Sequence, residues 1–331
     1  METIETCNLC GGKRQKVIEH YDHYDQVFTF VECLDCGLAF LNPRPTPDEM
    51  AAYYGEEYTR AHHHRFQEPG FPRSLFFLIQ RVWLRSRYGG RTPSILARWL
   101  VFPLEISWRW TIRCNVLYGL TRIGRVLDVG CGNGGWLTQM RLCGFECYGC
   151  EPDSVRAQTV ASIKGLKISA TDLHGAQYPD NYFDVVHIWN VLEHVHDPMA
   201  VLQETNRVLK QGGLVIISSP NHDSILVRVY PNIEDVPRHL FSFSLKTIRL
   251  YLEKTSFRLH HLRTGGDPWA IYGRFYEASL AYVREKGLSE QEEMTERFWK
   301  SRMRRFEYRP TREFFSKIGT GHAFFVSGVK I

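Results

Sequence analysis

The sequence contains no run of about 20 apolar residues, which is the length that a membrane-spanning helix needs. Its closest approach, Ser94–Trp110, is interrupted by Arg98, Glu105 and Arg109. The chain also does not open on the basic, apolar and small-residue segments of a secretory signal. We therefore expect a cytoplasmic protein, in which free thiols and metal-bound thiolates can both persist.

The sequence also lacks a strong charge of either sign, internal repeats and low-complexity segments. Its formal net charge of +5 permits an anionic substrate or nucleic acid as partner but requires neither. Hydrophobic residues make up 44% of the 331 positions and charged residues 23%, the balance of a folded globular protein rather than a disordered one. This length favours two structural units.

Four of the nine cysteines form two pairs near the N-terminus, Cys7 with Cys10 and Cys33 with Cys36. Two thiolates two residues apart can hold one edge of a tetrahedral zinc, and a second pair completes four ligands. Four ligands leave no open coordination position, so this zinc would be structural and would stabilise a unit with little core. Two disulfides are the alternative, which the expected compartment disfavours. A second group of cysteines is expected to be buried free thiols: Cys131, Cys143, Cys147 and Cys150.

Differences in residue composition and pattern divide the chain into three parts. Residues 1–58 form the predicted zinc-ribbon module, and residues 123–331 form an α/β domain. Between them, residues 59–122 are rich in arginine and tryptophan, which indicates a helical insert or a lid over the substrate. Helices within residues 72–120 would also suit peripheral contact with an anionic membrane, and arginine suits phosphorylated substrates.

Residues 123–262 alternate strand-like apolar runs with helical stretches, which indicates a parallel α/β sheet. Strands are expected near 125–129, 146–151, 182–188 and 213–218, and helices over 135–143, 154–164, 198–208 and 245–254. A charged helical insert is expected at about 271–310, followed by a closing strand at 321–331.

The first of these strands runs into the glycine-rich turn Gly130-Cys131-Gly132-Asn133-Gly134, and a helix follows at once. Glycines at such a turn let the backbone bend sharply and let a ligand approach closely. The turn alone is a weak signal, because nicotinamide, flavin and adenosylmethionine enzymes share it. Asp128, two residues before it, would repel a phosphate but attract a sulfonium and an ammonium group.

Two further acids are expected at the ends of the next two strands. Glu151 lies 21 residues after Gly130, where a carboxylate can accept hydrogen bonds from both ribose hydroxyls. Asp172 lies where a third strand would end, and it could accept a hydrogen bond from an adenine amino group. Together with the glycine turn, the three acids predict a cationic adenosine cofactor.

These segments, with 181–186, 189–195 and 208–214, resemble in order and spacing the successive motifs of class I S-adenosylmethionine-dependent methyltransferases. The resemblance covers about residues 123–262. It implies a Rossmann-like α/β fold whose seven-stranded, mostly parallel sheet has the order 3-2-1-4-5-7-6, with strand 7 antiparallel and helices on both faces. It also implies contacts with S-adenosylmethionine from the matching residues: Asp128, Gly130, Cys131, Gly132, Gly134, Glu151, Pro152, Asp172, Leu173, Asn190 and Val191. A four-cysteine ribbon ahead of such a domain is similar to a bacterial arrangement found in deoxysugar, secondary-metabolite and cell-surface pathways.

Two histidines are candidate general bases, which methyl transfer needs only if the acceptor must lose a proton. His194 follows the fourth expected strand and His239 the fifth, both at the carboxyl edge where α/β sheets bind ligands. Each could instead be a positioning or capping residue. Methyltransferases of ubiquinone precursors tend to carry an acid where this chain has Asn190, which disfavours metal-assisted catalysis and a catechol acceptor here.

The sequence therefore predicts an S-adenosylmethionine-dependent methyltransferase (EC 2.1.1.-) with a small-molecule acceptor, such as a sugar nucleotide or a precursor of an envelope or secondary metabolite. The alternative is methylation of RNA held by the ribbon and the arginine-rich segment. Residues 1–45 carry more acidic than basic side chains, which disfavours nucleic acid as partner. A nicotinamide dehydrogenase is disfavoured by Asp128 and by the lack of a second dinucleotide-binding half.

Overall fold

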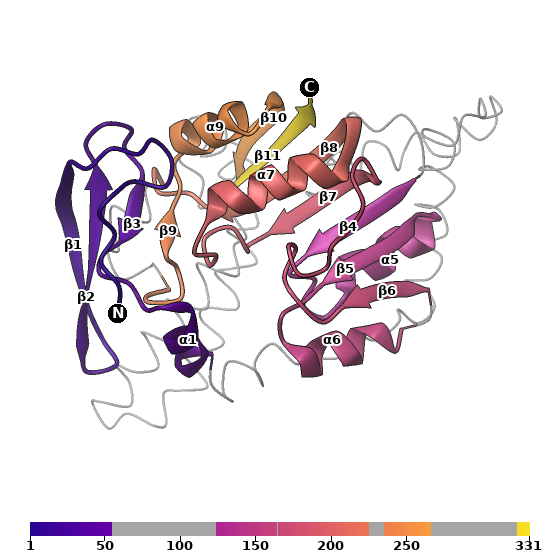
Figure 1. Cartoon of the computed structure of the whole chain (residues 1–331), viewed down its shortest axis with the longest axis horizontal. Helices are drawn as coiled ribbons and strands as arrows, with labels where there is room; N and C mark the ends of the chain where they lie inside the picture. Colours follow the sequence, from indigo (N-terminus) through magenta and orange to yellow (C-terminus); the bar gives the residue numbers. More distant parts are fainter. Residues whose placement is uncertain (55–123, 164, 225–234, 266–322) are drawn as a thin grey trace, which may run out of the picture.

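The computed structural model describes residues 1–54, 124–163, 165–224, 235–265 and 323–331, which build two sheets (Figure 1). The N-terminal unit (residues 1–54) contributes β1 (Gln15–His23), β2 (Gln26–Cys33), β3 (Ala39–Leu41), α1 (Pro47–Met50) and the short 3-10 helix η1 (Ala51–Tyr53). The predicted insert at 59–122, with its suggested membrane contact at 72–120, and the helical insert at 271–310 lie outside the described residues. No described helix is long and apolar enough to span a membrane.

The large sheet has seven strands in the order β10-β11-β8-β7-β4-β5-β6. These are β4 (Arg125–Val129), β5 (Glu146–Cys150), β6 (Leu166–Ser169), β7 (Phe183–Trp189), β8 (Leu209–Pro220), β10 (Phe257–Gly265) and β11 (Ala323–Lys330). Neighbours from β6 to β8 pair in parallel, whereas β11 is antiparallel to both β8 and β10. Counted from β4 as strand 1, the order is the expected 3-2-1-4-5-7-6 with strand 7 antiparallel.

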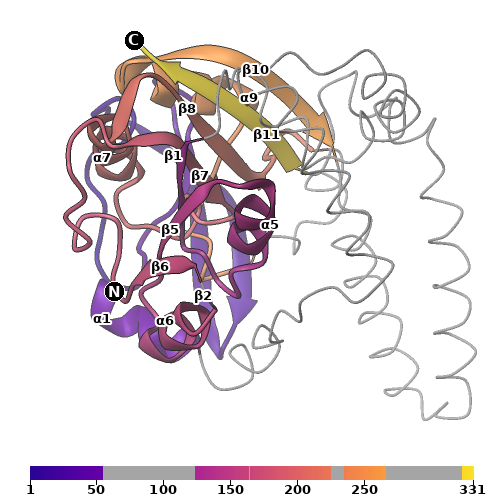
Figure 2. The same cartoon turned by 90° about the vertical axis from the view of Figure 1, so that its right-hand side faces the viewer.

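Helices cover both faces of this sheet. Figures 1 and 2 show α5 (Gly135–Cys143) and α6 (Ser154–Ala161) on one face, and α7 (Pro198–Val208) and α9 (Leu245–Lys254) on the other. The central strands bury side chains on both faces: Val126 and Val185 pack with Leu137 of α5, whereas Leu127 and Val186 belong to the core under α7 and α9. Such strands are mainly apolar, because neither face meets water.

Local signals explain the helix boundaries. Helix α5 begins after Gly134 and ends at Gly144, both in the left-handed conformation. Asp153 accepts hydrogen bonds from the first turn of α6, and Asp197 does the same for α7, which starts at Pro198. The bounds of α5, α7 and α9 match the expected ones. Helix α6 ends at Ala161, three residues before the expected end at Lys164.

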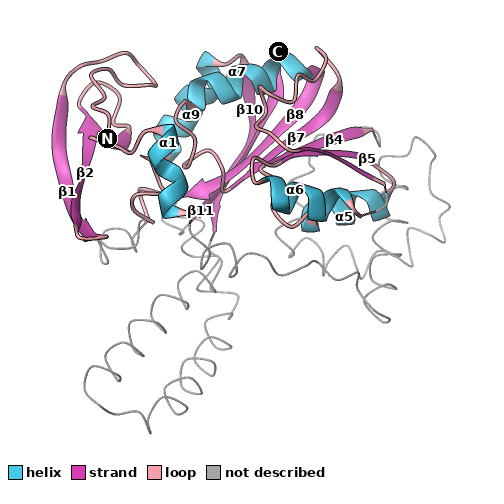
Figure 3. Cartoon of the chain, turned by 60° about the horizontal axis from the view of Figure 1, so that its bottom comes forward, coloured by secondary structure: helices cyan, strands magenta, loops and turns pink. Residues whose placement is uncertain are grey.

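The smaller sheet, in the order β1-β2-β3-β9, joins the N-terminal unit to the rest of the chain. Its last strand, β9 (Phe241–Ser242), comes from the C-terminal half and pairs with β3, so that Phe40 lies opposite Phe241. Figure 3 shows this sheet beside the large one. The two units predicted from the sequence therefore share a sheet, and the predicted boundary at residue 58 lies outside the described residues.

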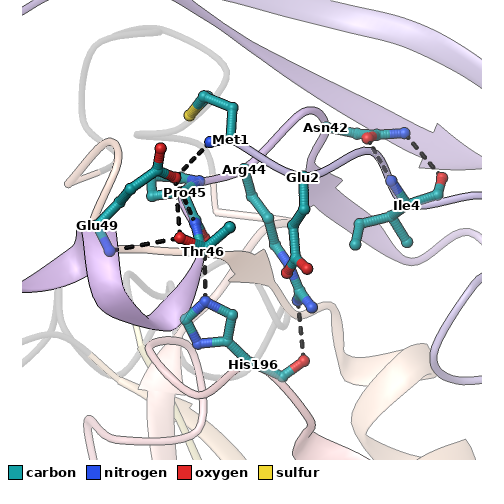
Figure 4. Close-up of polar contacts among 9 residues, drawn as sticks. All are labelled: Met1, Glu2, Ile4, Asn42, Arg44, Pro45, Thr46, Glu49 and His196. Atoms are coloured by element: carbon teal, nitrogen blue, oxygen red, sulfur yellow. Dashed lines mark hydrogen bonds and ion pairs between the residues drawn. The ribbon is translucent and has the colours of Figure 1, made fainter.

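Polar contacts strengthen this junction (Figure 4). The Arg44 guanidinium donates through Nη1 to the His196 carbonyl at 2.9 Å and through Nε to Glu2 at 2.8 Å. The His196 ring in turn lies with Nε2 3.0 Å from the Pro45 carbonyl. These contacts fasten the N-terminal unit to the turn between β7 and α7.

Candidate active site and four-cysteine centre

The glycine turn between β4 and α5 is shaped by three glycines with positive φ, at +62°, +55° and +68° for Gly130, Gly132 and Gly134. A Cβ on Gly130 would lie 2.7 Å from Cγ2 of Val191, and one on Gly134 would lie 2.6 Å from Cγ1 of Val160. A Cβ on Gly132 would meet nothing within 4 Å among the described residues. The outer glycines thus allow tight packing, whereas Gly132 borders open space that suits a ligand.

The Glu151 carboxylate supports this turn from the end of β5. Its Oε2 accepts the backbone N–H of Gly132 at 2.9 Å, and its Oε1 accepts that of Asp153 at 3.2 Å. The Arg156 guanidinium lies 3.7 Å from Oε1. Glu151 is therefore a buried, oriented acid that touches the middle glycine of the turn.

Two of the three acids proposed from the sequence lie at the glycine turn: Asp128 on β4 directly before it, and Glu151 bonded to Gly132. Burial raises the pKa of the Cys150 thiol to about 12, and the negative charges of Asp128, Glu151 and Asp172 add to this effect. Asp128 is buried at the end of β4, whereas Asp172 is exposed and accepts the Gly175 N–H at 2.7 Å. The structure thus places Asp128 and Glu151 beside the glycine turn, and the Cys150 thiol between the strands stays neutral.

The described cysteines of this sheet agree with the expectation of buried free thiols. Cys131, Cys147 and Cys150 are buried and form no disulfide. The side chain of Cys143 is outside what the structure describes.

Of the other proposed cofactor residues, Val191 packs against the glycine turn. Asn190, with a φ of +51°, ends β7 and donates its N–H to the Ser218 carbonyl at 2.9 Å. Val191 packs against Gly130, Pro152 follows Glu151 at the end of β5, and Leu173 is buried. Their contacts with a cofactor stay predictions.

Both candidate bases lie in one cluster with Glu193. Ligand atoms of Glu193, His194 and His239 lie within 4.8 Å of one another, and the two imidazole rings meet edge to face. The Glu193 carbonyl accepts the N–H of Leu240 at 2.8 Å, which holds the segment carrying His239 against the turn after β7. Glu193 Oε2 accepts the Ser219 hydroxyl at 3.0 Å.

The hydrogen bonds of His194 define which ring nitrogen carries the proton. Nδ1 lies 3.0 Å from the Arg238 carbonyl and 3.1 Å from the Tyr54 hydroxyl. Because a carbonyl only accepts, we assign the hydrogen to Nδ1, which leaves the lone pair on Nε2. Burial and the nearby His239 lower the pKa of His194 to about 3, so this ring is neutral near pH 7.

Asp235 and Arg238 complete the surroundings of the two histidines. Arg238 Nε donates to Asp235 at 3.0 Å, and the Arg238 guanidinium lies 3.4 Å from the Tyr53 carbonyl. Although burial opposes it, the hydrogen bond from Arg238 and the nearby histidines lower the pKa of Asp235. The cluster therefore holds a fixed negative charge beside two imidazoles.

The four N-terminal cysteines converge as the spacing predicts. Sγ of Cys7 lies 3.6 Å from that of Cys36, and Sγ of Cys10 lies 3.5 Å from that of Cys33. All four Sγ atoms lie within 4.8 Å of one another. Each pair ends in the same turn, with the N–H of Gly11 bonded to the Cys7 carbonyl and that of Gly37 to the Cys33 carbonyl, both at 2.8 Å.

Comparison with known proteins assigns the family. A family profile described as "Methyltransferase domain" matches residues 72–262, more than half of the 331 residues. The chain belongs to this methyltransferase family. The match includes the glycine turn, Glu151, Asp172, both candidate histidines and part of the segment that lies outside the described residues.

Among relatives of this methyltransferase, the ubiquinone biosynthesis O-methyltransferase of Yersinia pestis (strain Pestoides F) is 33% identical over 147 residues, covering 40% of this chain and 59% of that protein. The corresponding protein of Aeromonas salmonicida (strain A449) is 33% identical over 129 residues, covering 37% and 51%. An uncharacterized methyltransferase of Schizosaccharomyces pombe is 30% identical over 146 residues, covering 38% and 50%. The chain thus spans about half the length of the curated relatives it matches.

Solved structures similar to this methyltransferase include two S-adenosylmethionine-dependent methyltransferases. The one from Thermotoga maritima has a TM-score of 0.44 at 16% identity and covers 76% of this chain and all of that chain. The one from Archaeoglobus fulgidus has a TM-score of 0.44 at 18% identity and covers 75% and 98%.

Three residues of the candidate site, Tyr54, His187 and Glu193, carry no signal in the sequence. Tyr54 reaches His194 across 140 positions of sequence, and His187 contacts Asp128 across 59. No local pattern signals such long-range pairs. Glu193 stands directly before His194, and its burial beside a second histidine appears only in three dimensions.

Proposed function

We propose that this protein transfers the methyl group of S-adenosylmethionine to a small-molecule acceptor. Membership of the methyltransferase family supports the reaction class. The single observation that carries the choice of cofactor is the position of the buried acids Asp128 and Glu151 at the glycine turn, where Glu151 accepts the Gly132 N–H at 2.9 Å. Carboxylates beside such a turn disfavour a bound phosphate and favour a cationic ligand with ribose and amino groups to donate.

The residues present fit this cofactor. S-adenosylmethionine supplies a methyl group on a positively charged sulfur. The open side of Gly132 admits a ligand, and Glu151 is held in place by two backbone N–H groups to receive ribose hydroxyls. Asp172 and Leu173 would bind the adenine, and Asn190 and Val191 would close the site from the end of β7.

The histidine cluster is proposed to receive the acceptor. His194 is neutral near pH 7 and has a lone pair on Nε2, but a pKa of about 3 makes it a weak base, which suits a role in positioning the acceptor or in removing an already acidic proton. Glu193 and Asp235 lie close to the two rings, and Asp235 is itself paired with Arg238. His239 lies against the same ring and is the second candidate.

We place the acceptor among small molecules, such as sugar nucleotides or precursors of envelope or secondary metabolites. The matched relatives named for ubiquinone biosynthesis are O-methyltransferases, which supports oxygen as one acceptor atom. The acidic excess in residues 1–45 supports a small acceptor over a nucleic acid.

We also propose that Cys7, Cys10, Cys33 and Cys36 bind a structural zinc. With zinc–sulfur bonds of about 2.3 Å, a tetrahedral site places sulfur atoms about 3.8 Å apart, whereas a disulfide would join them at about 2 Å. The separations of 3.5 and 3.6 Å fit the metal.

Calorimetry with S-adenosylhomocysteine tests the proposal, followed by a screen of nucleotide sugars with labelled S-adenosylmethionine. We expect binding by the wild type and a loss of about tenfold or more in affinity for Asp128→Ala, because a buried charge facing the cofactor is removed. Asp180→Ala, at an exposed position, is the matched control. Absence of binding by the wild type would refute the proposal.

A further inference from the structure

His187 forms a buried pair with Asp128 that is built into the large sheet. The two residues are register partners on the parallel strands β4 and β7, so their side chains leave the same face side by side. His187 Nδ1 lies 2.7 Å from Asp128 Oδ1, and each side chain is only 6% exposed. The pairing is therefore fixed by strand register rather than by a loop.

Two tryptophans hold the plane of the His187 ring. Trp136 stacks on it with centroids 4.1 Å apart and planes inclined by 6°. Trp189, two residues along β7, lies at 5.3 Å and 22°. Because Trp136 is the second residue of α5, the stack also ties the helix that follows the glycine turn to β7. Nδ1 of His187 stays directed at Asp128 for this reason.

The direction of the hydrogen bond follows from its chemistry. An ionised carboxylate only accepts, so Nδ1 of His187 is the donor. A buried carboxylate needs such a donor, and hydrogen bonds to a charged group are stronger than neutral ones. The bond occupies Oδ1, and a carboxylate has further acceptor positions on its other oxygen. Asp128 can therefore be held by His187 and still receive an ammonium group.

We propose that His187 is a positioning residue for the cofactor, which holds Asp128 so that its carboxylate receives the amino-acid portion of S-adenosylmethionine. This inference rests on the proposed function and extends it to a residue outside the glycine turn. His187 acts only through Asp128. The two tryptophans brace the pair between the glycine turn and the strand that leads to Asn190.

Two ligands separate this role from a general effect on folding. S-adenosylhomocysteine carries the amino-acid portion, whereas 5′-methylthioadenosine keeps the adenosine and the thioether without it. In His187→Phe, the ring remains available to the tryptophans and the donor is lost. We expect calorimetry to show S-adenosylhomocysteine binding weakened about 10- to 100-fold, with methylthioadenosine binding unchanged within about twofold.

Further variants sharpen the test. His187→Asn places an amide N–H near the position of Nδ1 and should restore most of the affinity, whereas His187→Gln, whose amide reaches further, should not. Asp128→Asn should show the same selective loss, and the double variant His187→Phe/Asp128→Asn should add nothing to it. His260→Phe, at an exposed position of β10, is the matched control and should bind both ligands normally.

Several results would overturn the inference. One is normal S-adenosylhomocysteine binding by His187→Phe. Another is an equal loss for both ligands, because a structural role would weaken them alike. Independent, additive losses at His187 and Asp128 would also overturn it. If His187→Phe is poorly folded, His187→Gln, which should lack the bond to Asp128, replaces it in the double-variant cycle. A wild type that binds neither ligand would instead refute the proposed function itself.

Discussion

Replacing Glu151 with glutamine tests the cofactor side of the site with a change of only a few atoms. Both carboxylate oxygens accept backbone N–H groups, Oε2 from Gly132 at 2.9 Å and Oε1 from Asp153 at 3.2 Å. The side chain is 8% exposed, so water cannot easily replace either bond. In Glu151→Gln, one of these atoms becomes an NH2 group. In either orientation of the amide, its NH2 group faces a backbone N–H, and two donors cannot form a hydrogen bond with each other.

The size of the effect follows from these contacts. One accepted hydrogen bond is lost and one buried N–H is left without an acceptor, which costs about 1–3 kcal/mol. The weakened ion pair with Arg156 adds at most about 1 kcal/mol. We therefore expect the free energy of unfolding to fall by about 2 kcal/mol. The affinity for S-adenosylhomocysteine should fall at least about tenfold, because Gly132 loses its support and the ribose loses an acceptor.

Urea unfolding followed by circular dichroism, together with calorimetry, measures both quantities. Glu146→Gln is the matched control, because Glu146 stands at the opposite end of β5, is 43% exposed and pairs with Lys167 and Arg125. It should change the stability by no more than about 1 kcal/mol and leave ligand binding intact. If Glu151→Gln behaves like Glu146→Gln in both assays, the assignment of Glu151 is wrong.

Three further predictions address the rest of the molecule. Elemental analysis should find one zinc per wild-type chain and less in Cys36→Ser, and a metal-free wild type would exclude the zinc centre. The pKa of His194 is lowered from 6.5 to about 3 on folding, so the unfolded state binds more protons between these values. Urea midpoints should therefore fall as the pH drops from 6.5 towards 3, by less in His194→Asn than in the wild type; equal pH dependence would contradict the assignment. Arg44→Ala removes the contact with the His196 carbonyl, and we expect the free energy of unfolding to fall by about 1 kcal/mol. An unchanged urea midpoint would contradict this prediction.

The sequence predicted those parts of the fold that depend on short-range signals. The strand that enters the glycine turn, the helices capped by Asp197 and Ser244, and the cysteine knuckles are each encoded within a few residues. Strand β9 was not predicted, because two residues have no periodicity and their pairing with β3 depends on tertiary contacts. Helix α6 ends at Ala161, although the helical pattern of the sequence continues to Lys164.

The candidate site, too, could be predicted only where its residues stand next to a local signal in the sequence. Asp128, Glu151 and Asp172 follow from their places at predicted strand ends, which parallel strands bring to one edge. In the sequence the charge of Asp128 has no evident partner, whereas in the structure it is paired with His187. His187 becomes the partner of Asp128 through the register of two strands 59 positions apart, and no motif in the sequence indicates that register.

The contacts of Asn8 connect the proposed zinc centre to the histidine cluster, although the zinc would take no part in the proposed chemistry. Asn8 stands between Cys7 and Cys10, and its side chain bonds to Asp197 at 2.8 Å, to the Met199 N–H at 3.2 Å and to the Tyr251 hydroxyl at 2.8 Å. Asp197 caps α7 three residues after His194. Tyr54, which belongs to the same N-terminal unit, contacts His194 directly through its hydroxyl. A collapsed cysteine centre would therefore displace the turn that carries His194, and its first effect should be on turnover of the acceptor rather than on binding of the cofactor.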